Sequence, residues 1–172
     1  TVVAIEPGFS NFHRLQENVL LNNLQHKVIA LNLAASATNG ELLLIEETGK
    51  PGYSGNIVPQ HVAMPEMHSY RVVVPQLPLL HLPALFGVPQ PTHIKIDVDG
   101  NELGVLQGLA GFAAEQMMVE MKRGQEAPLE QWMADNGYDL AQRFVHGARV
   151  GKKTGLNMAD AWYGLWIKKG LS

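Results

Sequence analysis

The sequence predicts an α/β fold in which a mostly parallel sheet lies between two layers of helices and ends in an antiparallel hairpin. Short apolar, β-branched runs alternate with amphipathic segments along the 172 residues, as in β-α-β units. The opening shows this first, because residues 1–5 and 27–33 resemble strands and residues 10–23 between them a helix. The last two runs, 138–145 and 161–168, are joined by a Gly- and Lys-rich segment, which favours a hairpin.

The first half of the chain contains strands and one long helix. The run 1–5 is apolar and β-branched, as in a strand buried on both faces. Ser10 is a suitable N-cap for the following helix. Its inward stripe is expected to consist of Phe12, Leu15, Val19 and Leu20. After the strand 27–33, the pair Asn39-Gly40 predicts a turn into a strand at 41–47, which suggests a hairpin extension.

Residues 48–70 are rich in Gly, Pro, His and Met and have no sustained period, so they are predicted to form a long loop. Loops of this length are usually functional or disordered. The remaining elements are predicted in this order: a strand at 71–74, one helical turn at 83–86, a strand at 93–98, a helix at 101–114 and a strand at 116–122. A last helix is predicted with Pro128 in its first turn; it runs to Asn136, and Gly137 is at its C-terminal cap position.

Composition and charge exclude several classes of protein. Hydrophobic residues make up 46% of the chain and charged residues 17%, which suits one compact domain over residues 1–172. The net charge of -3 leaves no basic stripe, so nucleic acid is not an expected partner. The most apolar stretch, 72–88, contains Pro75, Pro78 and Pro83 and is too short to cross a bilayer. The absence of cysteine excludes thiolate chemistry and disulfides. We expect a cytoplasmic protein.

Acidic residues stand at the carboxyl ends of three predicted strands: Glu6, Asp97 and Glu120. In open α/β sheets, ligands bind beyond this edge, so we expect these side chains to meet there. Glu6 suits the two hydroxyls of a ribose. The same position also suits a solvated Glu, or one that stabilises the N-terminus of the next helix.

The strand before Asp97 carries charge on one face. Strand alternation places His93, Lys95 and Asp97 together. A Lys in the middle of a buried strand needs a partner, and Asp97, Glu6 or Glu120 could supply it. Such a charged cluster at a cleft is often functional, and structural ion pairs also occur.

The acids after this strand favour a structural role. Asp99 and Glu102 have the spacing of a capping box, in which Asp99 accepts from backbone N–H groups and Glu102 reaches back. Asp97-Val98-Asp99 also forms a D-x-D pattern of the kind found in metal-dependent sugar-nucleotide transferases, but the pattern is too short to be specific.

Other binding motifs are weak. The spacing around the Asp97 segment does not fit an EF-hand loop. Residues 151–155 resemble a phosphate loop in composition only. His61 and His68 lie in the long loop without zinc-ligand spacing, so we expect no metal site.

Several strings of residues together carry a family resemblance. They are Ala4-Ile5-Glu6-Pro7 with Leu15, Asn18 and Asn22-Asn23; Asn32-Leu33-Ala34-Ala35-Ser36 with Gly40-Glu41-Leu42; Ile94-Lys95-Ile96-Asp97-Val98-Asp99-Gly100 with Glu102, Val105-Leu106 and Gly108; and Val119-Glu120. In these strings the chain resembles the FkbM family of S-adenosylmethionine-dependent methyltransferases. The resemblance covers nearly all of residues 1–145 and implies a three-layer, Rossmann-like methyltransferase sheet.

The resemblance implies S-adenosyl-L-methionine as the cofactor. Glu6, with Pro7 beside it, would bind the ribose hydroxyls, and Ala35 and Ser36 would lie near the adenine. Asp97 would border the sulfonium and its methyl group. The implied reaction transfers that methyl group to a hydroxyl oxygen of a small molecule or carbohydrate, while a base removes the hydroxyl proton.

Asp97 is the first candidate for that base. Glu120 and the loop residues His61 and His68 are lesser candidates, and Lys95 completes the predicted catalytic group. The loop at 48–70 is the expected wall of the acceptor pocket, where substrate choice would be encoded.

Two departures from the family pattern stand out. Leu80-His81 occupies the place of the family's Leu-Asp, so any role of that Asp does not carry over. The family's first strand and glycine-rich loop would precede Thr1. We therefore expect the parent protein to carry an N-terminal segment, and residues 1–172 alone to bind the cofactor poorly.

Two other functions remain open. A metal-dependent glycosyl-type transferase could use Asp97 and Asp99, and would depend on manganese and a sugar nucleotide. A non-catalytic interaction module of the same fold would show a site in which Glu6, Asp97 and Glu120 do not converge.

Overall fold

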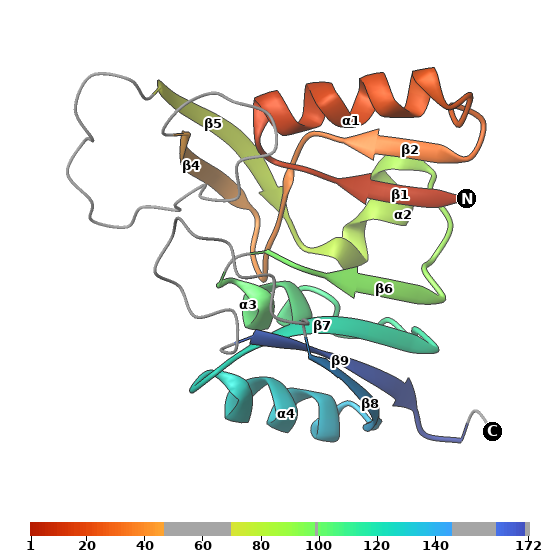
Figure 1. The fold of residues 1–172 in the computed structure, drawn as a ribbon, viewed down its shortest axis with the longest axis vertical. Coiled ribbons are helices and arrows are strands. Elements are labelled where there is room, and N and C mark those ends of the chain that lie inside the picture. Colours follow the sequence, from red (N-terminus) through yellow and green to blue (C-terminus); the bar gives the residue numbers. More distant parts are fainter. Residues whose placement is uncertain (47–69, 99, 146–160, 171–172) are drawn as a thin grey trace. The chain divides into compact units, whose positions relative to one another are not determined.

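The computed structural model describes residues 1–46, 70–98, 100–145 and 161–170 (Figure 1). The chain divides into two compact units, residues 1–89 and residues 90–172. Helices and strands are mixed in both units, which confirms the predicted α/β class.

The first unit opens with the predicted β-α-β motif. Strands β1 (Val2–Ile5) and β2 (Val28–Leu31) pair in parallel, and helix α1 (Phe9–Leu21) connects them. The helix begins at Phe9, with Gly8 as its N-cap, so the prediction of Ser10 as the N-cap is wrong. The Gly8 carbonyl accepts the first helical hydrogen bond, which starts the helix before Ser10.

The predicted inward stripe of α1 is partly wrong. The structure describes every residue of this helix, and none of them is buried. Phe12, Leu15 and Val19 are half-buried, whereas the Leu20 side chain is 67% exposed. Because α1 packs against β2, Leu20 lies at the edge of the covered stripe.

A three-stranded sheet completes the strands of the first unit. Strand β5 (Tyr70–Leu77) lies between β3 (Ala34–Ala35), which runs parallel to it, and β4 (Gly40–Glu46), which runs antiparallel. The expected hairpin at Asn39-Gly40 is therefore wrong, because β3 and β4 both pair with β5 and not with each other. Residues 47–69, most of the predicted loop, lie outside the described residues.

A helical segment ends the first unit. The 3₁₀ turn η1 (Leu79–His81) leads into α2 (Leu82–Phe86), which contains the predicted turn at 83–86. Pro83 lies in the first turn of α2, where its missing N–H has no helical partner to lose.

The second unit contains a four-stranded sheet in the order β6 (His93–Ile96), β7 (Gln116–Lys122), β9 (Ala161–Lys168) and β8 (Tyr138–Val145). β6 and β7 are parallel, whereas β9 runs antiparallel to both β7 and β8. The predicted antiparallel pair at the end of the chain is confirmed.

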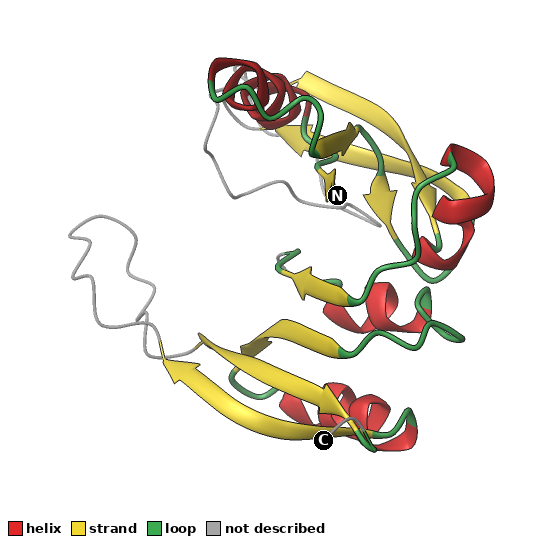
Figure 2. Cartoon of the chain, turned by 90° about the vertical axis from the view of Figure 1, so that its right-hand side faces the viewer, coloured by secondary structure: helices red, strands yellow, loops and turns green. Residues whose placement is uncertain are grey.

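Two helices pack together in the second unit. α3 (Glu102–Gln107) contacts α4 (Glu126–Asp135), and α4 contacts β7 and β8 (Figures 1 and 2). Pro128 lies in the first turn of α4, as predicted. α3 is much shorter than the predicted helix at 101–114, because Gly108 caps it and turns follow up to Gly111, whose φ is 99°.

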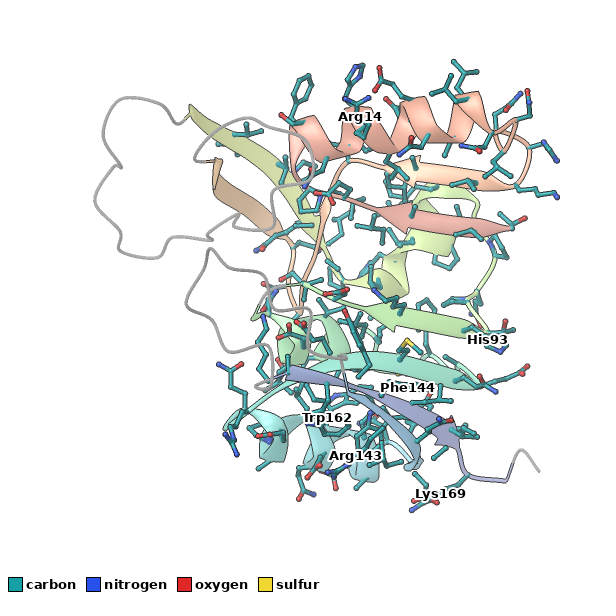
Figure 3. The ribbon with its side chains drawn as sticks, viewed as in Figure 1. Arg14, His93, Arg143, Phe144, Trp162 and Lys169 are labelled. Carbon is teal, nitrogen blue, oxygen red and sulfur yellow. The ribbon has the colours of Figure 1, made fainter. Side chains whose placement is uncertain are left out.

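Several elements of the second unit contribute buried apolar side chains to its core. Its fully buried side chains include Val105, Leu106, Leu109, Met117, Val119, Met121, Met133 and Tyr138. On β9, a Cβ at Gly164 would lie 2.5 Å from Nε1 of Trp166, so glycine is required between the flanking tryptophans. Beside this core, the Arg143 guanidinium lies 4.4 Å from the centroid of the Trp162 ring (Figure 3).

Candidate active site

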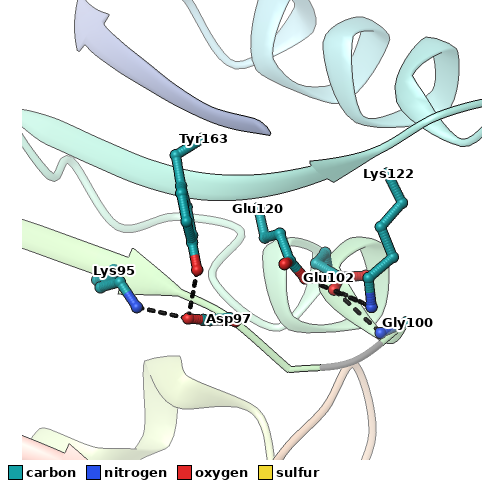
Figure 4. Close-up of polar contacts among 7 residues, drawn as sticks. All are labelled: Lys95, Asp97, Gly100, Glu102, Glu120, Lys122 and Tyr163. Carbon is teal, nitrogen blue, oxygen red and sulfur yellow. Dashed lines mark hydrogen bonds and ion pairs between the residues drawn. The ribbon is translucent and has the colours of Figure 1, made fainter. Parts of the chain in front are cut away.

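Asp97 and Glu120 follow the last paired residues of neighbouring parallel strands. Ile96 of β6 pairs with Val119 of β7, and the next residue of each strand is the acid. On the other side of β7, β9 places Tyr163 opposite Glu120. Figure 4 shows Asp97, Glu120 and Tyr163 in one cluster. The structure thus brings Asp97 and Glu120 together, as the strand order predicts.

Two donors hold one oxygen of the Asp97 carboxylate. Lys95 Nζ donates to Oδ2 over 2.6 Å, and the Tyr163 hydroxyl donates to the same oxygen over 2.7 Å (Figure 4). Lys95 Nζ also lies 5.1 Å from the centroid of the Tyr163 ring. Partial burial raises the pKa of Asp97, but the two hydrogen bonds and the charges of Lys95 and Lys122 outweigh it. The pKa therefore lies below its ordinary value of 3.8.

Glu120 has the opposite environment. Its side chain is only 14% exposed, and its Oε2 lies 3.4 Å from Lys122 Nζ. This contact is an ion pair, and Oε2 is buried with no hydrogen-bond partner in the described part of the chain. Burial raises the pKa of Glu120 above its ordinary value of 4.5. The charge of Lys122 opposes this, and the negative charge of Asp97 adds to it.

Glu102 extends the cluster from the start of α3. Its side chain is 4% exposed, its Oε1 accepts from the Gly100 N–H over 3.0 Å, and Lys122 Nζ lies 3.7 Å away. The predicted backward reach of Glu102 is confirmed. The predicted cap residue is wrong, because Asn101 is the N-cap and its side chain makes no capping hydrogen bond. Asp99 lies outside the described residues.

The predicted need of Lys95 for an acidic partner is confirmed, and the partner is Asp97. The reason given for that need was wrong, because the Lys95 side chain is 57% exposed. His93, Lys95 and Asp97 are all exposed and lie on the expected common face of β6, whereas Ile96 between them is buried. Lys95 therefore acts on Asp97 from the surface of the sheet.

Glu6 lies in the first unit, at the carboxyl end of β1. Its Oε1 accepts from the Gly8 N–H over 2.7 Å, at the N-terminus of α1. Asn32, which follows β2, donates to the Glu6 and Pro7 carbonyls over 2.9 and 3.0 Å and so fixes this strand end. The contact with Gly8 agrees with the structural alternative for Glu6, and the convergence of Glu6 with Asp97 and Glu120 stays a prediction.

Ala35 and Ser36 lie at the end of β3. The Ser36 N–H donates to the Leu77 carbonyl over 3.1 Å, and its Oγ accepts from the Thr38 N–H over 3.3 Å. Ser36 is 8% exposed, so its hydroxyl is part of a buried turn. Their predicted place near an adenine stays a prediction.

Tyr163 and Lys122 were not singled out from the sequence. Lys122 is two residues after Glu120 and shares its face of β7, so strand alternation could have found it. Tyr163 becomes a neighbour of Asp97 only because β9 pairs with β7. The local sequence around Tyr163 does not indicate which strand β9 pairs with.

Some predicted residues cannot be placed. His61, His68 and the segment 151–155 lie outside the described residues. Among residues 1–46, 70–98, 100–145 and 161–170, no group of three or more His, Asp or Glu side chains is arranged to hold a metal ion. Of the helices that the structure describes, none is long and apolar enough to span a bilayer.

Comparison with known proteins gives one match. The model of the Methyltransferase FkbM domain family matches residues 1–140, a segment that contains Glu6, Asp97 and Glu120 and ends before β9. A search of curated proteins and a search of solved structures each returned no match. With residues 1–140 of its 172 residues matched, the chain belongs to the FkbM methyltransferase domain family.

Proposed function

We propose that this protein transfers a methyl group from S-adenosyl-L-methionine to a hydroxyl oxygen of a small molecule or carbohydrate. The observation that carries the proposal is the pair Asp97 and Glu120, which follow the last paired residues of parallel strands β6 and β7 in a member of a methyltransferase family. The proposal includes a Rossmann-like, three-layer fold and one catalytic domain over residues 1–172.

The residues present are chemically suited to this cofactor. Glu6 has a half-buried carboxylate at a strand end that Asn32 fixes through two hydrogen bonds. Such a carboxylate can accept from both hydroxyls of a ribose. Asp97 is held as an anion, which suits a neighbour with positive charge. Pro7, Ala35 and Ser36 are proposed to border the adenosine.

In this reaction the protein must position the acceptor hydroxyl and supply a base for its proton. When bound, S-adenosyl-L-methionine supplies an electrophilic methyl group. In the proposed reaction one of the two carboxylates, Asp97 or Glu120, takes the proton of the acceptor hydroxyl as the oxygen–carbon bond forms. Holding the acceptor in line supplies much of the rate enhancement in such a displacement.

The alternatives have less support. A metal-dependent glycosyl-type transferase would need a cation on Asp97, but the Lys95 ammonium already lies 2.6 Å from Oδ2. A non-catalytic module has no need for adjacent acids, whereas Asp97 and Glu120 are neighbours with coupled charges.

A methyl-transfer assay tests the proposal. The protein is incubated with methyl-labelled S-adenosyl-L-methionine at saturating concentration and a panel of sugars and small alcohols, and the products are analysed by mass spectrometry. We expect an O-methylated product. Methyl transfer to nitrogen or carbon, or no transfer at saturating S-adenosyl-L-methionine, would contradict the proposal.

Variants sharpen this assay. Glu6→Gln is expected to weaken cofactor binding roughly tenfold or more, since a hydrogen bond to a charged group contributes about 1.5–3 kcal/mol. Arg14→Ala is the matched control, because Arg14 is exposed on α1 and pairs with Glu17 over 2.7 Å. Equal binding by both variants would exclude Glu6 from the cofactor site.

A further inference from the structure

The ionised carboxylates of Asp97 and Glu120 are stabilised to different extents by their surroundings. Oδ2 of Asp97 accepts from Lys95 over 2.6 Å and from Tyr163 over 2.7 Å. To take a proton, Asp97 would have to give up part of this charge-assisted bonding, which stabilises the ionised form. Asp97 is therefore a weak base.

Glu120 has no such pair of donors. Its Oε2 is buried with no hydrogen-bond partner in the described ranges, and its ion pair with Lys122 is 3.4 Å long. Lys122 is itself shared with Glu102, 3.7 Å from its Nζ. In such a place the protonated carboxyl group is favoured, because a buried negative charge with incomplete hydrogen bonding is unstable.

The groups that face Glu120 come from each neighbouring element. Lys122 lies on the same strand, Asp97 follows β6, Glu102 begins α3, and Tyr163 lies opposite on β9 with its hydroxyl bonded to Asp97. Both acidic neighbours disfavour the ionised form of Glu120, and the charge of Lys122 opposes them.

We propose that Glu120 accepts the proton of the acceptor hydroxyl, while Lys95 and Tyr163 keep Asp97 ionised as a fixed negative charge. This division of labour rests on the proposed O-methyl transfer. In the step, the hydroxyl O–H bond breaks and its proton passes to a carboxylate oxygen of Glu120. The oxygen–methyl bond forms as the sulfur–methyl bond breaks, and the electron pair of that bond goes to sulfur.

The assignment follows a general rule for paired acids. Where two titratable groups lie in environments that push their pKa values apart, the two groups carry different roles. The pKa of Asp97 is lowered and that of Glu120 is raised, each for reasons visible in its contacts. Tyr163 is then a positioning residue, and it lies beyond residues 1–140, the segment that matches the family.

The test compares pH profiles of methyl transfer for the wild type and for Glu120→Gln, Glu120→Asp, Asp97→Asn and Tyr163→Phe, with calorimetric binding of S-adenosylhomocysteine as a second readout. Glu120→Gln should lower kcat about 10²–10⁴-fold, the usual contribution of a general base, and leave S-adenosylhomocysteine binding nearly unchanged. Glu120→Asp should recover part of the rate. Lys169→Ala is the control, since Lys169 pairs only with the exposed Asp139 in the described structure, over 3.2 Å.

The acid limb of the kcat/KM profile separates the two carboxylates. It should disappear in Glu120→Gln and stay at the same pH in Tyr163→Phe. An acid limb that moves upward in Tyr163→Phe, or a Glu120→Gln variant with wild-type kcat, would overturn the assignment.

Carboxyl NMR titration decides the same question without turnover. Glu120 should titrate at higher pH than Asp97, and Tyr163→Phe should raise the pKa of Asp97 alone. The reverse order would overturn the division of labour even if no methyl transfer were detected, whereas absent transfer with the expected order would count against the proposed function only.

Discussion

The two compact units differ in how they bury their sheets. In the second unit, β7 alternates between buried residues, Met117, Val119 and Met121, and a less buried face that carries Glu120 and Lys122. In the first unit, no residue of β1 or β2 is buried, although the structure describes both strands completely. The helices differ too, since short α3 has buried residues and the longer α1 has none.

This difference bears on the candidate site. Asp97 and Glu120 extend from strands that carry buried residues, Ile96 on β6 and Val119 on β7, and such support helps to fix neighbouring side chains in position. Glu6 extends from a two-stranded sheet whose helix covers it loosely. A hollow of about 210 Å³ lies between α1 and β2, and it is lined by Gln16, Val19, Leu20, Gln25, Val28 and Ala30.

The largest expected effect contrasts one leucine from each unit. Leu106 is 0% exposed and Leu20 is 67% exposed. Leu106→Ala should lower the free energy of unfolding by about 2–5 kcal/mol, because it removes buried methyl groups and leaves a cavity. Leu20→Ala should change it by less than about 0.5 kcal/mol. Urea denaturation measures both, and equal losses would show that α1 is buried in solution.

A smaller effect is expected from a buried hydrogen bond of the second unit. The Tyr138 hydroxyl donates to the Ala114 carbonyl over 2.8 Å, and both residues are buried. Tyr138→Phe leaves that carbonyl without its donor and should cost about 1–3 kcal/mol in the free energy of unfolding.

The first unit offers the matched control for this hydrogen bond. Asn22 donates to the Asn18 carbonyl over 2.8 Å at the exposed end of α1. Because water can replace this donor, Asn22→Ala should cost only a few tenths of a kcal/mol, on the order expected for exposed positions. If thermal melts give the two variants the same loss, the contrast in burial between the units has no energetic consequence.

The sequence predicted most of the second unit correctly. The bounds of β7, β8 and β9 agree with the predicted strands, because each is a run of strand-forming residues bounded by turn residues. The short α3 was overestimated, because the apolar pattern continues past Gly108 into turns that also bury Leu109. Apolar periodicity reports burial, and it does not show where helical hydrogen bonds end.

The first unit was harder to predict because its pairing depends on distant strands. The Asn39-Gly40 signal is a local one. β4 pairs instead with β5, which begins at Tyr70, 24 residues after β4 ends at Glu46. The acids of the site could be predicted because each follows a strand along the sequence. Tyr163 could not be predicted, because its place beside them depends on the position of β9 in the sheet. Strand order is a tertiary property, so neighbours across a sheet cannot be found from a single strand.

The smallest expected effects come from the charges of the site. The lowered pKa of Asp97 stabilises the folded state above pH 3.8, and this contribution is lost as the pH falls through the lowered pKa. The raised pKa of Glu120 acts in the opposite direction. Its contribution is present below pH 4.5 and is lost as the pH rises through the raised pKa, because the folded state then releases a proton that it had held more tightly than the unfolded chain.

Asp97→Asn should therefore lower the free energy of unfolding at neutral pH by less than about 1 kcal/mol, as for other exposed ion pairs, and this difference should shrink in acid. Glu120→Gln should remove the decline of stability that begins above pH 4.5. Urea midpoints measured between acid and neutral pH test both signs. A Glu120→Gln variant that loses stability at neutral pH and regains it in acid, as Asp97→Asn does, would show that the two carboxylates share one environment. In that case the hydrogen bonds of Asp97 and the burial of Glu120 would not give the two carboxylates different charge states.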